Sequence, residues 1–301
     1  MKNYPERKRA FWIFLATLIL VAFFWLKANG KDIWDKIYTP SIYEIFPVTS
    51  GVNHKGKEEI QTQINNLTRK LIGTYGVYVY SFATGEEFGQ NFDDFFPAAS
   101  LNKIPIMLDF YRTAEKGAIS LNTIYALKEE DIQDYGTGSI RYEEPGKKYT
   151  YEELLELSGK QSDNTAAHIL DNILSKQHVN LFLKTLGFQK TSMDENLSTP
   201  KEIGQMFVKT YNGEILKKKS FLDKFYSALS ETDFEDRLVK GFPDNTKVSH
   251  KIGSGDRAYS DCGLVFAENP FVLCLMSKDA SEDEALAVMP KIAKLVWVYL
   301  R

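Results

Sequence analysis

The sequence predicts an α+β domain in which one antiparallel sheet is built from both ends of the chain, is flanked by helices and is joined to an all-helical subdomain. Strand-like runs occur early, within residues 77–91, and return late, within residues 247–278. Helical periodicity dominates the intervening residues 100–230. The early and late strands are therefore expected to share one sheet, with the helical middle as an insert.

Each element follows from its residue pattern. Apolar residues recur at helical spacing through residues 58–72, which predicts an amphipathic helix. Residues 77–82 are rich in β-branched and aromatic side chains and precede turn residues at Thr84-Gly85, so a strand pair is expected there. Turn-forming residues interrupt the helical middle at Gly117, Gly136, Gly138, Pro145, Gly146 and Pro200. Three late strands are expected at 247–252, 259–267 and 271–278, and a closing helix at 285–300.

Composition restricts the class of protein. With 301 residues the chain can form one large domain or two small ones. The formal net charge is −3 and no long basic block is present, so nucleic acid is not expected as a partner. Four histidines, two cysteines and the absence of C-x-x-C and H-E-x-x-H patterns argue against a zinc site, and neither a metal nor a cofactor is expected.

The N-terminus is expected to be a membrane anchor. Residues 10–26 carry no charge, and at about 1.5 Å per residue they span roughly 25 Å. Basic residues within 1–9 precede this segment, which predicts a cytoplasmic N-terminus, a single span of the cell membrane and an extracytoplasmic domain. Residues 27–57 are interpreted as a tether and residues 58–301 as the folded domain. A cleaved signal peptide is the alternative, but the apolar run is longer than usual and no small-x-small site follows.

Three short motifs follow one another in the chain. Residues 100–103 read S-x-x-K, residues 162–164 read S-D-N, and residues 251–253 read K-I-G, which approximates K-T-G. Alone, S-x-x-K is not specific, because about one match is expected by chance in a chain of this size. A second match begins at Ser198, but Thr199-Pro200 inside it is typical of a helix cap followed by proline at the first helical position. The specific signal is the trio, whose members start 62 and then 89 residues apart.

In order and spacing these motifs are similar to those of class A β-lactamases and other penicillin-recognising serine hydrolases. The segments 136–140, 149–155 and 250–255 resemble the same family, and the resemblance covers roughly residues 58–301. It implies a β-lactamase/transpeptidase-like fold and an acyl-enzyme formed on Ser100. The implied substrates are β-lactams, D-Ala-D-Ala-like peptides or related amides and esters.

Elementary chemistry explains why this reaction needs these residue types. Ser100 and Lys103 are three residues apart, so on a helix they share a face. A serine in the first turn also lies at the positive end of the helix dipole. Its hydroxyl is a weak nucleophile until a base takes the proton, and a lysine does so only when it is neutral. A second cation nearby, Lys251, is expected to lower the pKa of Lys103.

The remaining site residues complete the expected reaction. Ser162 relays the proton to the leaving nitrogen, and Lys251 holds Ser162 and the substrate carboxylate. Asn164 donates an amide hydrogen bond to the acyl side chain of the substrate and orients Lys103. The resemblance implies an oxyanion hole formed by the backbone N–H groups of Ser100 and Ser254. The expected catalytic residues are Ser100, Lys103, Ser162 and Lys251, and the expected substrate-binding residues are Asn164, Gly253 and Ser254.

Nearby residues are expected to have structural roles. Asp163 is expected to accept backbone hydrogen bonds in a loop. His250 is interpreted as a histidine at a strand end rather than a catalytic one, and Asp261 as a packing and loop-anchoring residue. Cys262 and Cys274 lie in neighbouring strand-like runs, and both a disulfide and two buried free thiols fit. The free thiols are favoured, because the sequence does not place the Cβ atoms.

The chain departs from the family pattern in two places. Ile252 stands where the family usually carries Thr or Ser, which removes a hydroxyl expected at the substrate carboxylate, and Ser254 is expected to replace it in part. The family also has a long loop with a glutamate and an asparagine that hold the deacylating water, whereas here only residues 192–197 follow the G-F-x-x-T segment before the next helix. Glu195 lies there at a spacing that does not match, so a solvated turn and slow deacylation are expected.

Two other functions remain open at this point. A non-enzymatic sensor or binding module for β-lactams or peptidoglycan would be acylated or occupied and then held, which the short loop makes reasonable. A wall-associated domain would keep the fold without chemistry, but the intact motif side chains argue against it. The leading prediction is a serine hydrolase whose partner is a β-lactam or a peptidoglycan peptide.

Overall fold

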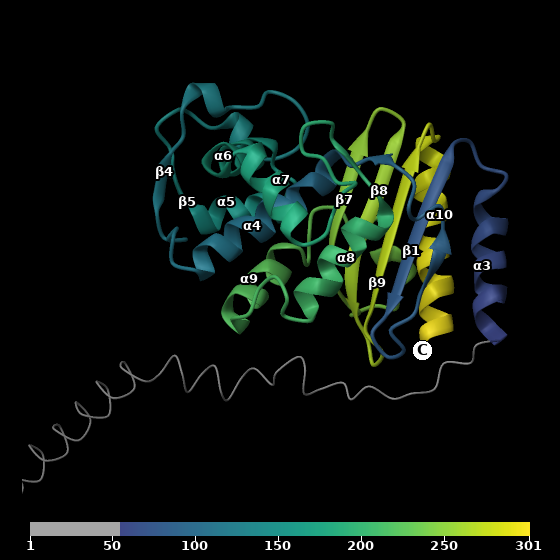
Figure 1. Cartoon of the computed structure of the whole chain (residues 1–301). Coiled ribbons are helices and arrows are strands. Elements are labelled where there is room, and N and C mark those ends of the chain that lie inside the picture. Colours follow the sequence, from purple (N-terminus) through teal and green to yellow (C-terminus); the bar gives the residue numbers. More distant parts are fainter. Residues whose placement is uncertain (1–54) are drawn as a thin grey trace, which may run out of the picture. The chain divides into compact units, whose positions relative to one another are not determined.

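The sheet predicted from the two ends of the chain is present (Figure 1). It has five strands in the order β2-β1-β9-β8-β7, and every neighbouring pair is antiparallel. The α+β prediction is therefore confirmed: β1 pairs along its whole length with β9, although the two strands lie at opposite ends of the sequence. The strands are β1 (Thr74–Ser81), β2 (Glu87–Gln90), β7 (Lys247–Gly255), β8 (Ala258–Phe266) and β9 (Phe271–Lys278).

The computed structural model describes residues 55–301. The expected basic tail at 1–9, the apolar segment at 10–26 and nearly all of the expected tether at 27–57 lie outside the described residues. Between residues 55 and 301, no helix is both long enough and apolar enough to cross a membrane.

Helices cover both faces of the sheet (Figure 1). On one face α3 (Lys55–Thr68) packs beside α10 (Glu282–Leu300). On the other face α8 (Pro200–Tyr211) lies against β1, β8 and β9. The helical subdomain contains α4 (Lys103–Glu115), α5 (Tyr151–Lys160), α6 (Asn164–Leu174), α7 (Lys176–Thr185) and α9 (Lys219–Ala228).

Strand β1 shows how the residue pattern builds two hydrophobic cores. Successive side chains of a strand point to opposite faces of the sheet. Val77 and Val79 pack in the cluster beneath α3 and α10, whereas Tyr78 packs in the cluster that α8 and the helical subdomain share. A Cβ on Gly204 of α8 would lie 2.4 Å from the Tyr78 ring, so glycine is needed for α8 to approach the sheet this closely.

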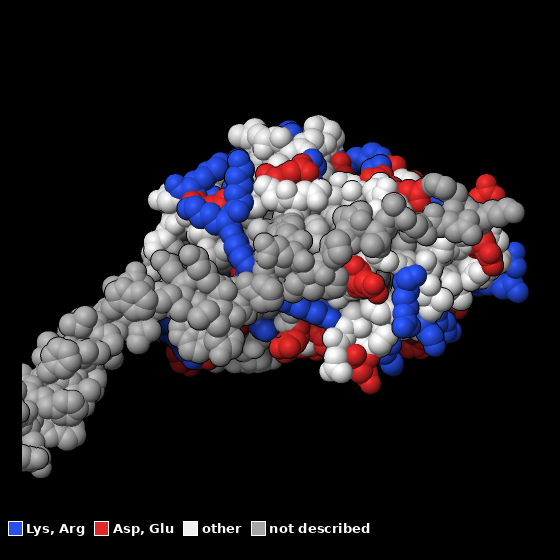
Figure 2. All heavy atoms as spheres, turned by 90° about the horizontal axis from the view of Figure 1, so that it is seen from below, with Lys and Arg blue, Asp and Glu red and all other residues white. Residues whose placement is uncertain are grey.

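Surface charge contributes little to holding these layers together. On the face seen in Figure 2, acidic and basic side chains lie next to one another. Exposed pairs at i,i+4 spacing, such as Lys219–Asp223, each add about 0.3–0.5 kcal/mol at most. The two hydrophobic clusters therefore dominate the stability of the described domain.

Short elements connect the layers and set the entry to the helical subdomain. The chain passes from β3 (Phe96–Pro97) into the 3-10 turn η1 (Ala99–Asn102) and then α4. β3 pairs with β6 (Leu197–Ser198), just before Thr199 caps α8 and Pro200 occupies its first turn. The second S-x-x-K match is therefore a helix start, as predicted, and its Ser198 is fully buried. The remaining short elements are β4 (Ile124–Ala126), β5 (Lys148–Thr150), η2 (Glu129–Asp131), η3 (Ile140–Tyr142) and η4 (Val239–Gly241).

The prediction of free thiols is wrong, because Cys262 and Cys274 form a disulfide. The two residues are direct partners in the register of β8 and β9. Both are fully buried on the side of the sheet that faces α8. A sequence shows that two strands are adjacent, but a shift of one residue in their register would have sent the side chains to opposite faces.

Candidate active site

The serine and lysine of the first motif lie close together at the start of α4. Ser100 lies in η1, Lys103 is the first residue of α4, and Lys103 Nζ is 3.2 Å from Ser100 Oγ. The sequence predicts Ser100 in the first turn of a helix. The backbone instead bends at Ala99, whose φ is 47°, so that a 3-10 turn carries the serine and precedes the α-helix.

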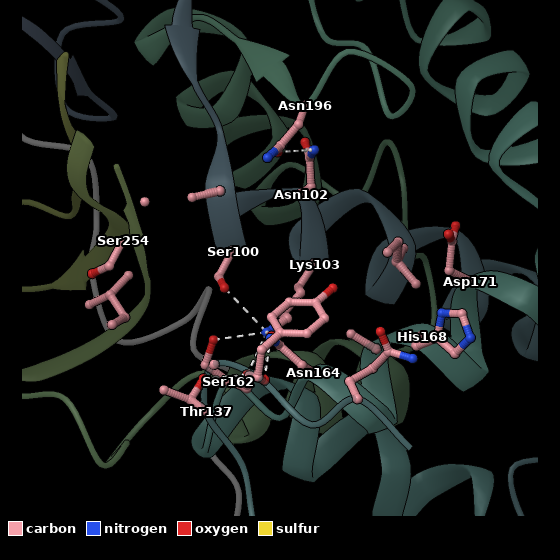
Figure 3. Close-up of a pocket in the computed structure, with 18 of the residues that line it drawn as sticks. Ser100, Asn102, Lys103, Thr137, Ser162, Asn164, His168, Asp171, Asn196 and Ser254 are labelled. Carbon is pink, nitrogen blue, oxygen red and sulfur yellow. Dashed lines mark hydrogen bonds between the residues drawn. The ribbon is translucent and has the colours of Figure 1, made fainter. Parts of the chain in front are cut away.

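Four oxygens surround the Lys103 amine (Figure 3). Besides Ser100 Oγ these are the backbone oxygen of Ser162, Ser162 Oγ at 3.0 Å and Asn164 Oδ1 at 2.8 Å. A carbonyl oxygen and an amide oxygen can only accept hydrogen bonds. In the neutral amine these two acceptors take the two N–H groups, which leaves the lone pair for the hydroxyls of Ser100 and Ser162. The amine is thus oriented as a base for either serine.

Burial makes the neutral form of Lys103 accessible near neutral pH. Removing an ammonium group from water disfavours its charge. Burial accordingly lowers the pKa of Lys103 from 10.5 to about 7, and the charge of Asp163 opposes the shift. The sequence predicts that the charge of Lys251 causes this shift, but the structure assigns it to burial. Lys251 is itself fully buried, so its own pKa lies well below 10.5, with the charge of Lys103 as the second cause.

The second motif is held by the segment that precedes it. Asp163 caps α6 by accepting hydrogen bonds from the backbone N–H groups of Ala166 and Ile140, both at 2.9 Å, as the prediction of a loop acid requires. Thr137 Oγ1 donates to the backbone oxygen of Ser162 at 2.8 Å. A Cβ on Gly138 would lie 2.2 Å from the Asp163 carboxyl carbon. The resemblance noted at residues 136–140 therefore has a physical cause, because this segment contacts Ser162 and Asp163 directly.

The third motif lies beside the nucleophile on β7. A Cβ on Gly253 would come within 2.8 Å of the Ala98 backbone oxygen, so this glycine lets β7 approach η1. Lys251 Nζ donates to the Ile252 backbone oxygen at 3.2 Å. Among the described residues, no hydrogen bond joins Lys251 to Ser162, the partner that the sequence predicts for it.

A cleft of about 660 Å³ brings most of the predicted residues together. Ser100, Lys103, Ser162, Asn164 and Ser254 all line it (Figure 3). Lys251 and Gly253 lie behind its wall rather than on it. The cleft runs between the β7 edge of the sheet and the first turns of α4 and α6, so it exists only where the two parts of the fold meet.

Arg237 is a cleft residue that the sequence analysis missed. Its guanidinium donates to the backbone oxygens of Gly253 at 2.9 Å and Ser260 at 2.7 Å, and to Ser254 Oγ at 2.6 Å. The side chain is 5% exposed and lines the cleft at the Ser254 end. A lone arginine in an irregular segment carries no sequence signal. Only the packing of that segment against β7 places it here.

The opposite end of the cleft is polar and belongs to α6. His168 and Asp171 lie one and two turns beyond Asn164, and Figure 3 shows them side by side, away from Ser254. Burial raises the pKa of Asp171, and the charges of Lys176 and His168 oppose the shift. These polar side chains border the space into which an acyl chain would extend from Ser100.

The short segment 192–197 forms a tight turn beside the nucleophile. Glu195 is exposed there and does not line the cleft, and its backbone N–H donates to Ser192 Oγ at 3.1 Å, so the prediction of a solvated turn is confirmed. Asn196 faces the cleft instead, where its Oδ1 accepts from Asn102 Nδ2 at 2.6 Å. An amide such as that of Asn196 cannot serve as a general base. The turn also places Asp194 on the cleft wall, where its Oδ2 accepts a hydrogen bond from Asn180 Nδ2 at 2.8 Å.

His250 and Asp261 lie behind the cleft. His250 is on β7 and 1% exposed, and its Nδ1 is 2.8 Å from Asp261 Oδ1. Asp261 Oδ2 accepts a hydrogen bond from the backbone N–H of Leu238 at 3.0 Å. The predicted loop-anchoring role of Asp261 is confirmed, and His250 lines no part of the cleft.

Comparisons with known proteins agree with this geometry. A family model described as the beta-lactamase enzyme family matches residues 59–300. The β-lactamase VEB-1 of Pseudomonas aeruginosa is 25% identical over 272 residues, which cover 80% of this chain and 90% of the relative. A β-lactamase of Bacteroides uniformis is 23% identical over 296 residues, which cover 88% of this chain and 100% of the relative.

Solved structures show the same fold. PBP-A superposes with a TM-score of 0.75 at 22% identity, covering 80% of this chain and 95% of its own. The extended-spectrum β-lactamase TLA-1 gives a TM-score of 0.75 at 24% identity, covering 81% of this chain and 99% of its own. The predicted β-lactamase/transpeptidase-like architecture is therefore confirmed.

The lowered pKa of Lys103 predicts how the reactivity of Ser100 depends on pH. The neutral amine is the active form, so the rate constant for acylation of Ser100 should rise about tenfold per pH unit below pH 7 and level off above it. Single-turnover acylation, followed by mass spectrometry across pH 5–10, measures this profile. Lys103→Arg keeps the positive charge and should lose the reaction, whereas exposed Lys219→Arg should leave the profile unchanged. A midpoint near 10 would contradict the assignment of Lys103 as the base.

Proposed function

The chain belongs to the beta-lactamase enzyme family, and from that premise we propose that it is a serine hydrolase that forms an acyl-enzyme through Ser100 with β-lactams or D-Ala-D-Ala-like peptides. The observation that carries the proposal is the hydrogen-bonded chain of Ser100 Oγ, Lys103 Nζ and Ser162 Oγ within one cleft. A nucleophile, a base and a proton relay are thus in contact before any substrate binds.

The acylation step follows from these contacts. Ser100 Oγ attacks the carbonyl carbon of the scissile amide as its proton passes to Lys103 Nζ, 3.2 Å away. The C–N bond then breaks, and the leaving nitrogen takes the proton of Ser162 Oγ. Lys103 returns a proton to Ser162 over 3.0 Å, so the amine ends neutral, as it began. The backbone N–H groups of Ser100 and Ser254 are the proposed donors to the oxyanion.

Arg237 is the proposed partner of the substrate carboxylate. Penicillins and peptides that end in D-alanine both carry a carboxylate on the leaving side of the amide. The guanidinium lies at the Ser254 end of the cleft and keeps its charge despite its burial, because arginine does not lose its proton in proteins. It compensates for Ile252, which lines the same cleft without a hydroxyl.

Deacylation is proposed to be slow. Hydrolysis of the ester needs a water molecule and a base that takes its proton. The turn 192–197 places Asn196 and Asp194 on the cleft wall. The amide of Asn196 is no base, and the Asp194 carboxylate already accepts a hydrogen bond from Asn180 Nδ2 at 2.8 Å. A missing general base costs about 10²–10⁴-fold in rate. PBP-A, which has the same fold, has been solved in one variant as an acyl-enzyme complex with penicillin G. The alternative of a module that only binds its ligand is less well supported, because such a module has no need of a buried lysine of lowered pKa beside a serine.

The choice of nucleophile is tested by covalent labelling. A fluorescent penicillin should label the protein on Ser100, and Ser100→Ala should abolish the label, because the other hydroxyl bonded to Lys103, that of Ser162, is the proposed proton relay. Lys103→Ala should slow labelling by about 10²–10⁴-fold. Ser227→Ala, in the exposed face of α9, is the matched control and should label normally. Labelling of Ser100→Ala would place the nucleophile elsewhere.

The second chemical step is tested with the wild-type protein. The penicillin adduct should persist for minutes or longer in intact-mass spectra, and nitrocefin should show a burst of one equivalent followed by slow turnover. Fast steady-state hydrolysis of nitrocefin without an adduct would overturn this prediction. Loss of that hydrolysis in Glu195→Gln would then identify the exposed glutamate as the missing base.

We also propose that residues 10–26 anchor the domain outside the cell membrane. The proposal is supported by seventeen uncharged residues behind a basic segment at 1–9. The full-length chain should stay with membranes through a high-salt wash and dissolve only in detergent. A reporter fused after Arg301 should be active only outside the cytoplasm, and release by salt alone would contradict the anchor.

A further inference from the structure

The segment between α9 and β7 delivers the arginine to the cleft. Phe234, Asp236 and Arg237 from this segment all line the cleft. The segment has no regular structure until η4 begins at Val239. Its position therefore depends on individual hydrogen bonds rather than on a helix or strand ladder.

Two carboxylates hold this segment on either side of Arg237. Glu235 Oε1 accepts hydrogen bonds from the backbone N–H and the hydroxyl of Thr232, at 2.6 and 3.0 Å. Asp261 Oδ2 accepts from the backbone N–H of Leu238 at 3.0 Å. The first anchor lies two residues before the arginine and the second holds the residue directly after it.

One buried imidazole joins the two anchors. His250 Nδ1 lies 2.8 Å from Asp261 Oδ1, and His250 Nε2 lies 3.3 Å from Glu235 Oε1. The side chains of His250 and Asp261 are 1% and 0% exposed. Only the doubly protonated imidazolium can donate to both carboxylates at once, because the neutral ring has a single N–H.

We propose that His250, as an imidazolium bridging Glu235 and Asp261, is a positioning residue that holds Arg237 against the substrate carboxylate. The inference rests on the proposed function, since Arg237 needs a carboxylate-bearing substrate to act on. His250, the residue before the third motif, thereby contributes to substrate recognition without touching the substrate. Through Arg237 the bridge favours substrates that carry a carboxylate, and it does not act on the amide that reacts.

The surrounding charges support the charged form of His250. The two carboxylates raise its pKa from 6.5 to about 9, against the opposing effect of burial. The other charged groups that face the bridge are Lys251, next in the chain, and Arg237. Burial lowers the pKa of Lys251 well below 10.5, which disfavours a second cation beside the imidazolium. Because the folded pKa is raised, the bridge is complete below about pH 6.5 and is lost as the pH rises through about 9.

The test compares two substrates that differ only in the carboxylate. Benzylpenicillin and its methyl ester carry the same β-lactam, so the ratio of their second-order acylation rate constants isolates the contribution of the carboxylate. Arg237→Gln should reduce that ratio by about 10- to 100-fold, the effect of a lost charge-assisted hydrogen bond. His250→Asn and His250→Gln place an amide N–H near Nδ1 and Nε2 respectively, so each keeps one anchor and loses the other. Both should reduce the ratio at least fivefold while the ester rate constant stays within about twofold of wild type.

Two further measurements separate positioning from stability. In the wild type the acid-to-ester ratio should fall as pH rises through about 9, whereas the ester rate constant, governed by Lys103, should stay on its plateau. Glu235→Gln should move that fall to lower pH, because only Asp261 then raises the pKa of His250. Glu214→Gln, an exposed carboxylate paired with Lys209, is the matched control and should behave as wild type.

The outcomes distinguish the inference from the function beneath it. Equal losses of the acid and ester rate constants in the His250 variants would show a purely structural role and overturn the inference. The inference would also be overturned if the acid-to-ester ratio of rate constants stayed unchanged in the His250 variants but fell in Arg237→Gln. The same holds if the ratio stayed unchanged in Arg237→Gln itself. A wild-type protein that forms no Ser100 adduct with either compound would refute the proposed function itself, before any variant is made.

Discussion

The site depends on keeping one lysine amine out of water while giving it oxygens to bind. Lys103 is 6% exposed, and the loss of hydration is the main reason that its pKa falls to about 7. An amine in this environment is a base at neutral pH only if its remaining N–H groups are satisfied. The backbone oxygen of Ser162 and Oδ1 of Asn164 satisfy them, so the lone pair is directed to the serine hydroxyls.

This constraint accounts for two strained backbone positions that lie beside the amine. The hydroxyls of Ser100 and Ser162 both contact Lys103. Ala99, which precedes Ser100, has a positive φ of 47°, and Ser162 has a positive φ of 53°. Non-glycine residues in this region cost about 1–3 kcal/mol each. The surrounding hydrogen bonds offset that cost: Thr137 binds the Ser162 carbonyl, and Asp163 caps α6. Strain at these two positions therefore accompanies the placement of the Ser100 and Ser162 hydroxyls at the amine.

Burial also affects the charge of the basic residues near the cleft in different ways. It lowers the pKa of Lys103 and of Lys251, which disfavours the state in which both lysines are charged. Arg237, which is nearly as buried, cannot give up its charge. The arginine is thus suited to bind an anion and Lys103 to take a proton. Paired carboxylates behind the wall, Glu235 and Asp261, balance the positive charge that remains.

The sequence by itself determined the α+β architecture, the helix start at Pro200 and the loop role of Asp163, because periodicity and caps are local properties. The clustering of Ser100, Lys103, Ser162 and Asn164 was predicted from the resemblance of the motifs to a known family. Tertiary structure alone decided the disulfide between Cys262 and Cys274, since strand register depends on the whole sheet. It also decided that Arg237 reaches the cleft and that burial, rather than the charge of Lys251, neutralises Lys103. An irregular segment has no periodic signal, and desolvation is set by every element that packs around a group.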